Sequence, residues 1–314
     1  MNYSPFELIM VLLLAHIMDI IYPYHKGILF KVHPVHTSYV MAVRLGKEFS
    51  SRIRGVVVWI LTISLHMIVY AIIIYASLLI HRSLLILISA YILKTSFSIR
   101  LLLNIVRNVA YYLRMGDLHT ARFWVQQIVR RDTQNLREHH LASAAIESLA
   151  ESLVDGYLSP LFYFLLLGPL GALFQRLTNT LDSALGYKEP RYKDVGWFSA
   201  RADTVVNYIP ARLTGFLIAL TSPVAGGSIL TAIKTMRQEC RKTESVNAGY
   251  PISSMAGALG VVLEKVGHYT INNNAREACW ADILRACRIA KFFVMLWIII
   301  SLTILTIFDI IFLY

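Results

Sequence analysis

Residues 56–80 are VVVWILTISLHMIVYAIIIYASLLI, and residues 84–103 are LLILISAYILKTSFSIRLLL. Each run has the length of roughly 20 mostly apolar residues that an α-helix needs to cross a bilayer. The linker between them, His81-Arg82-Ser83, is short enough for a tight helical turn. This stretch therefore predicts a hairpin of two membrane-spanning helices.

The composition of the whole chain agrees with a membrane protein. Of its 314 residues, 56% are hydrophobic and 16% are charged, whereas a soluble domain has about 25% charged and about 45–50% apolar residues. The apolar residues are gathered into long runs, which excludes a disordered protein, a fibrous protein and most soluble enzymes. The net charge of +11 fits basic loops on the cytoplasmic side of a membrane. No nucleic-acid-binding motif is present, so we expect no nucleic-acid partner.

Further apolar runs extend the hairpin on both sides. Residues 6–22 and 292–314 each predict another span. Residues 158–174 and 205–230 are also apolar, but glycine and proline interrupt them, as at Gly168-Pro169. Irregular backbone at membrane depth is tolerated where it is buried in protein or lines a cavity. Each of these two segments therefore predicts either a full span or a re-entrant hairpin.

We predict an all-α, polytopic integral membrane protein with about four to six spanning or re-entrant helices and cytoplasmic helical segments. Residues 1–314 would form a single membrane-embedded catalytic domain. Loop 23–55 is rich in Lys and Arg and holds one acidic residue, Glu48, which predicts a cytoplasmic loop. The other segments predicted to be polar and cytoplasmic are 104–157, 177–204 and 231–290. Two full spans at 158–174 and 205–230 would instead place 177–204 outside.

An acidic stripe precedes one of the broken apolar runs. In 141–156, LASAAIESLAESLVDG, the residues Glu147, Glu151 and Asp155 are four apart, so on a helix they lie within an arc of about 80°. Gly156 predicts the helix end. An unpaired acidic face beside a membrane segment is costly, and bound Mg²⁺ or arginine partners would compensate for it. The alternative is a solvated acidic surface.

Cations and carboxylates alternate in residues 179–203, NTLDSALGYKEPRYKDVGWFSARAD. Such a mixture suits a phosphate-plus-magnesium site, because cations bind oxyanions and carboxylates bind the metal. The alternative is a surface loop with screened ion pairs, each worth under about 1 kcal/mol. Arg212 lies within an apolar stretch, where a charge usually faces the protein interior or an aqueous cavity.

Other motifs are weaker or absent. His33, with His25 and His36 nearby, permits a metal site, but polar residues at the membrane interface are the favoured interpretation. The chain has no phosphate-binding G-x-x-x-x-G-K-[ST] loop, which excludes a P-loop ATPase. The three cysteines lack a C-x-x-C pair, so neither a disulfide framework nor a cysteine zinc site is expected.

Several motifs together are similar to one family. They are HPV at 33–35, GDLHTAR at 116–122, RDT at 131–133, ESLAESLVDG at 147–156, NTLDSALGY at 179–187, RY at 191–192, ARAD at 200–203, NYIPARLT at 207–214, NAGYP at 247–251 and MAGALG at 255–260. In this order and spacing the chain resembles the adenosylcobinamide-phosphate synthase (CobD/CbiB) family of cobalamin biosynthesis. It departs from the family pattern at Thr204, where a second aspartate is usual, and at Tyr250, where tryptophan is usual.

The resemblance implies a multi-pass enzyme of the cell membrane with its active site facing the cytoplasm. It would join aminopropanol phosphate to the corrinoid substrate adenosylcobyric acid by an amide bond, using ATP and Mg²⁺. Partners besides these substrates would be the lipid bilayer and other membrane enzymes of the corrinoid pathway. The roles that we predict are Glu147, Glu151, Asp155 and Asp182 for the metal; Arg191, Arg201 and Arg212 for phosphates, with Arg212 in the catalytic centre; Asn179 and Asn247 for orientation; and His33 or Asp203 as the catalytic base.

Two other functions remain open on the sequence alone. One is a non-enzymatic membrane protein that binds or transports corrinoids. The other is a different membrane transferase of phosphorylated substrates, because aspartate-rich motifs around N-x-x-D also occur in such enzymes. ATP consumption would separate the enzyme from a carrier, and a requirement for a corrinoid would separate the two enzymes.

Overall fold

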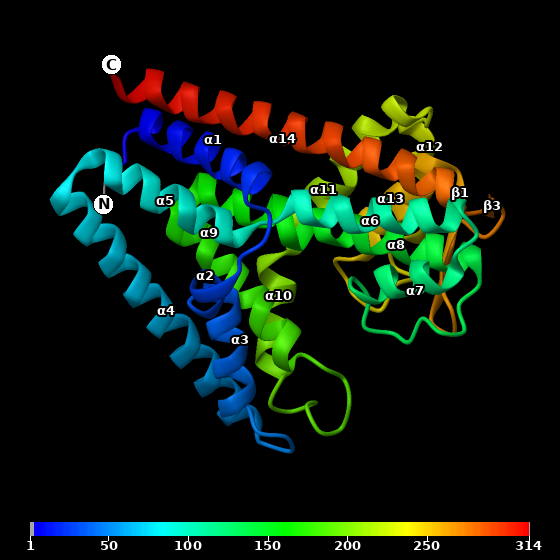
Figure 1. The fold of residues 1–314 in the computed structure, drawn as a ribbon, viewed down its shortest axis with the longest axis horizontal. Coiled ribbons are helices and arrows are strands. Elements are labelled where there is room, and N and C mark those ends of the chain that lie inside the picture. Colours follow the sequence, from blue (N-terminus) through cyan, green and yellow to red (C-terminus); the bar gives the residue numbers. More distant parts are fainter. Residues whose placement is uncertain (1–2, 314) are drawn as a thin grey trace. The chain divides into compact units, whose positions relative to one another are not determined.

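The computed structural model describes residues 3–313, and helices dominate them, as predicted (Figure 1). The elements are α1 (Pro5–Ile21), α2 (Gly27–Lys31), α3 (Pro34–Leu45), α4 (Arg52–Ile80), α5 (Arg82–Ser96), α6 (Ile99–Arg114), α7 (Leu118–Gln126), α8 (Glu138–Leu153), the π-helical turn η1 (Val154–Leu158), α9 (Ser159–Leu185), α10 (Trp197–Val206), α11 (Tyr208–Thr221), the 3-10 turn η2 (Ser222–Ala225), α12 (Ile229–Glu239), α13 (Gly249–Leu259), β1 (Val261–Lys265), β2 (Tyr269–Ile271), β3 (Arg276–Glu277) and α14 (Trp280–Leu313). The small sheet, in the order β2-β1-β3, was not predicted.

Four helical segments within the described residues are long and apolar enough to cross a membrane. They are Arg52–Ile80, Arg82–Arg114, Glu138–Leu185 and Trp280–Ile311. A fifth candidate arises if the broken pair α10 and α11 counts as one span. The predicted fold class, an all-α polytopic membrane protein, is confirmed. Helix α1 has 17 residues, which is near the lower length limit for a span.

Contacts divide the chain into two compact units. The first unit comprises the chain up to Ile99, Asp155–Asn207 and the chain from Ile300 onward. The second comprises Arg100–Val154 and Tyr208–Ile299. Both units combine segments that are far apart in the sequence. Some of the predicted site residues belong to the first unit and others to the second.

In the first unit, α9 packs against α3, α4, α5 and α10, while α1 packs against α5 (Figure 1). Buried leucines of α9, including Leu173 and Leu177, form a core with Val58 of α4 and Ile92 of α5. The predicted break in α9 is present. Gly168 has a φ of 67°, which favours glycine, and Pro169 after it lacks an N–H donor. Whether this segment crosses or re-enters the membrane stays a prediction.

Two helix boundaries differ from the prediction. The helical run does not end at Gly156, because the π-helical turn leads directly into α9 and Pro160 occupies its first turn, where proline is tolerated. The predicted span 84–103 is interrupted, since Phe97 is extended, with φ −138° and ψ 160°. The Ser98 N–H then donates to the carbonyl of Gly156 at 3.4 Å.

In the second unit, α13 packs against α8, α11, α12 and β1. Small residues allow this close approach. A Cβ atom on Gly257 would lie 2.6 Å from the Thr235 Oγ1 atom of α12, so only glycine fits there without movement. Strand β1 pairs antiparallel with β2, Leu263 opposite Ile271, and parallel with β3. Because β1 packs against α8, it brings strand residues next to the acidic stripe.

Candidate functional site

A buried polar cluster lies between α9 and α10 in the first unit. Asn179 Nδ2 donates to Asp203 Oδ1 at 3.1 Å, and Asn207 Nδ2 donates to the same oxygen at 2.8 Å. Gln175 Nε2 donates to Asn207 Oδ1 at 3.0 Å. Gln175, Asn179 and Asn207 are buried, and a buried polar network of this kind fixes the positions of its members. Two predicted residues, Asn179 and Asp203, are therefore in direct contact.

Arg176 is the cation of this cluster, and it was not predicted from the sequence. Its Nη1 atom lies 3.5 Å from Asn179 Oδ1, and its charge interacts with the carboxylates of Asp155 and Asp203. Arg176 thus gathers three predicted residues from η1, α9 and α10. The only indication in the sequence was the charge of Arg176 itself. It lies three residues before Asn179, shortly after an apolar run, where a charged residue often has a function.

His33 lies within electrostatic range of Arg176. Its imidazole packs edge-on against that of His25, with ring centroids 4.4 Å apart. Burial, followed by the neighbouring charges, lowers the pKa of His33 to about 3, and burial and Lys94 lower the pKa of His25 to about 4. Both imidazoles are therefore neutral near pH 7, and a pKa this low makes His33 a weak proton acceptor.

The depressed pKa values of His25 and His33 make folding sensitive to acid. In the unfolded state both imidazoles would bind a proton below about pH 6.5. In the folded state they stay unprotonated until the pH is much lower. Stability should therefore fall as the pH drops below about 6.5, by less than about 1.4 kcal/mol per pH unit for each histidine because both are partly exposed. Thermal unfolding between pH 7.5 and 5 measures this. Replacing both by glutamine should flatten the profile, and an unchanged slope would contradict the assignment.

The remaining predicted residues of the first unit lie in different surroundings. Asp182 is half-buried on α9, and a Cβ atom on Gly186 would lie 1.8 Å from its Oδ1 atom. Arg191 is exposed and pairs with Glu189 at 2.7 Å and with Glu48 at 3.5 Å. Arg201 is exposed on α10. The contacts of Arg191 are surface ion pairs, so a phosphate-binding role for Arg191 or Arg201 stays a prediction.

In the second unit, Glu147 of α8 is held by two hydroxyl groups. Ser143 Oγ donates to its Oε1 atom at 2.6 Å, and the Tyr269 hydroxyl donates to Oε2 at 2.7 Å. Arg131 Nη2 lies 3.6 Å from Oε1. Burial, followed by the charge of Glu147, raises the pKa of Tyr269, which keeps its hydroxyl protonated as a donor. Glu147 is thus a fixed, buried carboxylate.

Glu151, one turn further along α8, is exposed and repels Glu147 electrostatically. The charges of Lys265, Arg131 and Arg130 oppose that repulsion. Part of the acidic stripe therefore has the cationic partners that the sequence suggested. Asp155 and Asp182 belong to the first unit, so convergence of all four carboxylates on one metal stays a prediction.

Arg212 of α11 lies between two aromatic rings. Its guanidinium carbon is 3.3 Å from the centroid of Tyr208 and 4.3 Å from that of Tyr250. Its Nη1 atom donates to the Tyr208 carbonyl at 2.6 Å and to Asn247 Oδ1 at 3.1 Å. The NYIPARLT and NAGYP motifs therefore meet at Arg212, and Tyr250 supplies one of its two rings. A stacked, planar guanidinium suits recognition of carboxylate or phosphate groups.

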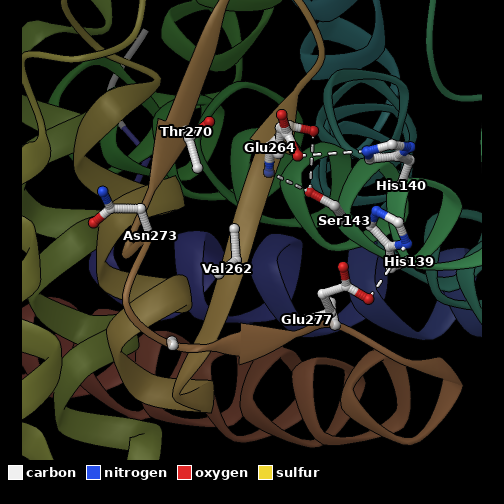
Figure 2. A pocket seen from close by; sticks show the side chains of 10 residues that line it. His139, His140, Ser143, Val262, Glu264, Thr270, Asn273 and Glu277 are labelled. Carbon is white, nitrogen blue, oxygen red and sulfur yellow. Dashed lines mark hydrogen bonds and ion pairs between the residues drawn. The ribbon is translucent and has the colours of Figure 1, made fainter.

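A further group of polar residues was not predicted from the sequence. His139 and His140 of α8 line a cavity of about 360 Å³ together with Glu264 and Glu277 of the small sheet (Figure 2). The adjacent histidines in REHH at 137–140 were the only visible signal. Their carboxylate partners come from strands that were not predicted, so the group could not be assembled from the sequence.

Comparisons with known proteins identify the family of the chain. The family model described as CobD/Cbib protein matches residues 12–297. The chain is 49% identical over 273 residues to the probable cobalamin biosynthesis protein CobD of Aeropyrum pernix, covering 87% of this chain and 85% of that one. It is 38% identical over 309 residues to the protein of the same description from Thermoplasma volcanium, covering 96% of this chain and 100% of that one. No solved structure matches the chain. The match of the family model across most of the sequence shows that this chain belongs to the CobD/Cbib protein family.

Proposed function

We propose that this chain acts in cobalamin biosynthesis as an adenosylcobinamide-phosphate synthase. It would form an amide bond between a propionate carboxyl of adenosylcobyric acid and the amine of aminopropanol phosphate. The observation that carries the proposal is the family match over residues 12–297. The structure supports it by placing the motif residues Asn179 and Asp203 in one contact and Arg212 and Asn247 in another.

The proposed chemistry needs activation of a poor electrophile. Transfer of the ATP γ-phosphoryl group to the corrinoid carboxylate would give an acyl phosphate and ADP, and attack by the amine would then release phosphate and form the amide. Fixed cations stabilise a transferred phosphoryl group. The candidate for this role is Arg176 in the first unit and Arg212 in the second. The attacking amine must lose a proton, for which Asp203 or the more weakly basic His33 is the candidate acceptor.

The residues present also fit Mg²⁺, which prefers oxygen ligands. When bound, it would neutralise phosphate charge. Glu147 and Glu151 are the candidate ligands in the second unit, and Asp155 and Asp182 are the candidate ligands in the first. The hydrogen bonds that Glu147 accepts from Ser143 and Tyr269 are of the kind that orient a ligating carboxylate.

Corrinoid product analysis tests the proposal. Purified protein in detergent is incubated with adenosylcobyric acid, aminopropanol phosphate, ATP and Mg²⁺, and the corrinoids are analysed by mass spectrometry. We expect the amide product only when both ATP and the protein are present. Corrinoid binding without product or ATP consumption would indicate a carrier, and ATP-dependent chemistry that needs no corrinoid would indicate another transferase.

The proposed active-site orientation makes a separate prediction. In a chain whose own cysteines are replaced, a cysteine at Lys193, which is exposed, should resist a membrane-impermeant thiol reagent in intact cells. The same cysteine should react in inside-out vesicles, because the basic loop 23–55 favours the cytoplasm for this side of the chain. A cysteine at Lys47 in that loop is the matched control. Labelling of Lys193→Cys from outside would contradict a cytoplasmic site.

A further inference from the structure

Two histidines and a carboxylate converge in the second unit, apart from the contacts of Arg212 and next to Glu147, to which Ser143 donates at 2.6 Å. His139 and His140 lie in the first turn of α8, and Glu264 lies on β1 across the cavity of about 360 Å³. One possible ligand atom from each of the three lies within 4.8 Å of the others. Figure 2 shows both imidazoles on the same side of the cavity, with the carboxylates of Glu264 and Glu277 directed toward them.

The distances suit a metal ion better than direct hydrogen bonds. His140 Nε2 lies 3.4 Å from Glu264 Oε2, which is longer than the usual range of about 2.7–3.2 Å. Two ligand atoms at about 2.0–2.1 Å from a tetrahedral metal ion lie about 3.3 Å apart. The observed separation therefore matches one edge of such a coordination shell.

The second histidine has a partner that could orient it. His139 Nδ1 lies 3.5 Å from Glu277 Oε2, and a carboxylate that binds one ring nitrogen commonly directs the other toward a metal. The exposed fractions of the His139 and His140 side chains are 24% and 17%. These side chains are therefore partly shielded from water yet still accessible to an ion from solution.

Ser143 supports the arrangement from one turn below the histidines. The backbone N–H of Glu264 donates to Ser143 Oγ at 2.7 Å, which ties β1 to α8. The candidate ligands thus lie on a helix and a strand that are joined by this hydrogen bond. Sites on helices and strands keep their geometry better than sites on loops.

We propose that His139, His140 and Glu264 bind a divalent transition-metal ion of the Zn²⁺ class. Imidazole nitrogen suits zinc and its first-row neighbours, whereas Mg²⁺ takes oxygen ligands. Three protein ligands beside an open cavity leave a coordination position for water or a small ligand. The proposal does not rest on the proposed synthase activity or on the Mg²⁺ that ATP would bring.

Metal titration tests the proposal on the full chain in detergent. After chelator treatment, Zn²⁺ is added in a calorimeter, and Co²⁺ is added in a spectrophotometer to report ligand type. We expect one saturable equivalent that excess Mg²⁺ does not displace. His139→Gln, His140→Gln and Glu264→Gln should each weaken binding by about 100-fold or more, because losing even an outer-shell partner costs about 10–100-fold.

His268→Gln is the matched control. His268 forms an exposed pair with Glu244 at 2.6 Å, so this variant should leave the Zn²⁺ affinity unchanged. A readout without substitutions is protection from diethyl pyrocarbonate, mapped by mass spectrometry. Zn²⁺ should protect His139 and His140 but not His268. Absence of a stoichiometric site, displacement by Mg²⁺, or equal loss of binding in the control would overturn the proposal, even if the corrinoid amide is formed.

Discussion

Replacing Arg212 by leucine should lower amide product formation by about 100- to 1,000-fold, the usual effect of removing one electrostatic group that stabilises a transition state. The protein should still insert in the membrane, because leucine suits an apolar helix. Arg212 donates to Asn247 and lies between Tyr208 and Tyr250. The variant therefore removes a preorganised cation and leaves both rings in place. Product yield at saturating substrate, normalised to purified protein, is the measurement.

Conservative variants separate charge from geometry at the same position. Arg212→Lys keeps the charge but loses the planar fork and most of the stacking, so intermediate activity is expected. Tyr250→Trp should retain activity because it keeps a ring against the guanidinium, whereas Tyr250→Ala should not. Arg241→Leu, an exposed arginine of the same unit, is the control. Full activity of a normally inserted Arg212→Leu protein would refute a catalytic role.

The spans were predictable because they depend on local composition. The run at 56–80 lies within α4, and residues 292–313 of the run 292–314 lie within α14, with residue 314 outside the described residues. A bilayer selects length and hydropathy over one continuous segment. The Gly168 kink was also predictable from its neighbour Pro169. The interruption at Phe97 and the π-helical turn after α8 were not, because they depend on contacts made by chain segments that are distant in sequence.

The site was predictable in part for the same reason. Motif spacing identified Asn179, Asp203, Arg212 and Asn247, and the structure joins them in two direct contacts. It did not identify Arg176, whose role becomes visible only when α10 and η1 pack beside α9. Residues that are in contact in the fold but far apart in the chain leave no local pattern in the sequence. The short strands of the small sheet were not predicted either, because no alternation of apolar and polar residues marks them.

Replacing Arg176 by methionine is expected to have the largest effect on stability. It would leave the carboxylates of Asp155 and Asp203 without the cation that interacts with both. Leaving a buried charge uncompensated costs about 3–5 kcal/mol, and the half-buried position of Arg176 puts the expected loss at or below the lower end. Methionine keeps the length and apolar stem of the side chain, so packing changes little. The melting temperature in detergent measures the effect.

A double variant distinguishes lost charge from lost packing. Arg176→Met combined with Asp203→Asn should recover much of the stability, because asparagine removes one unpaired charge and its Oδ1 atom still accepts from Asn179 and Asn207. Activity should not recover, since the proposed phosphate-binding cation is still missing. Arg201→Met, on the exposed part of α10, should change stability little. If Arg176→Met melts at the temperature of the unmodified protein, Arg176 does not neutralise this cluster, and its carboxylates must be protonated or paired with another cation.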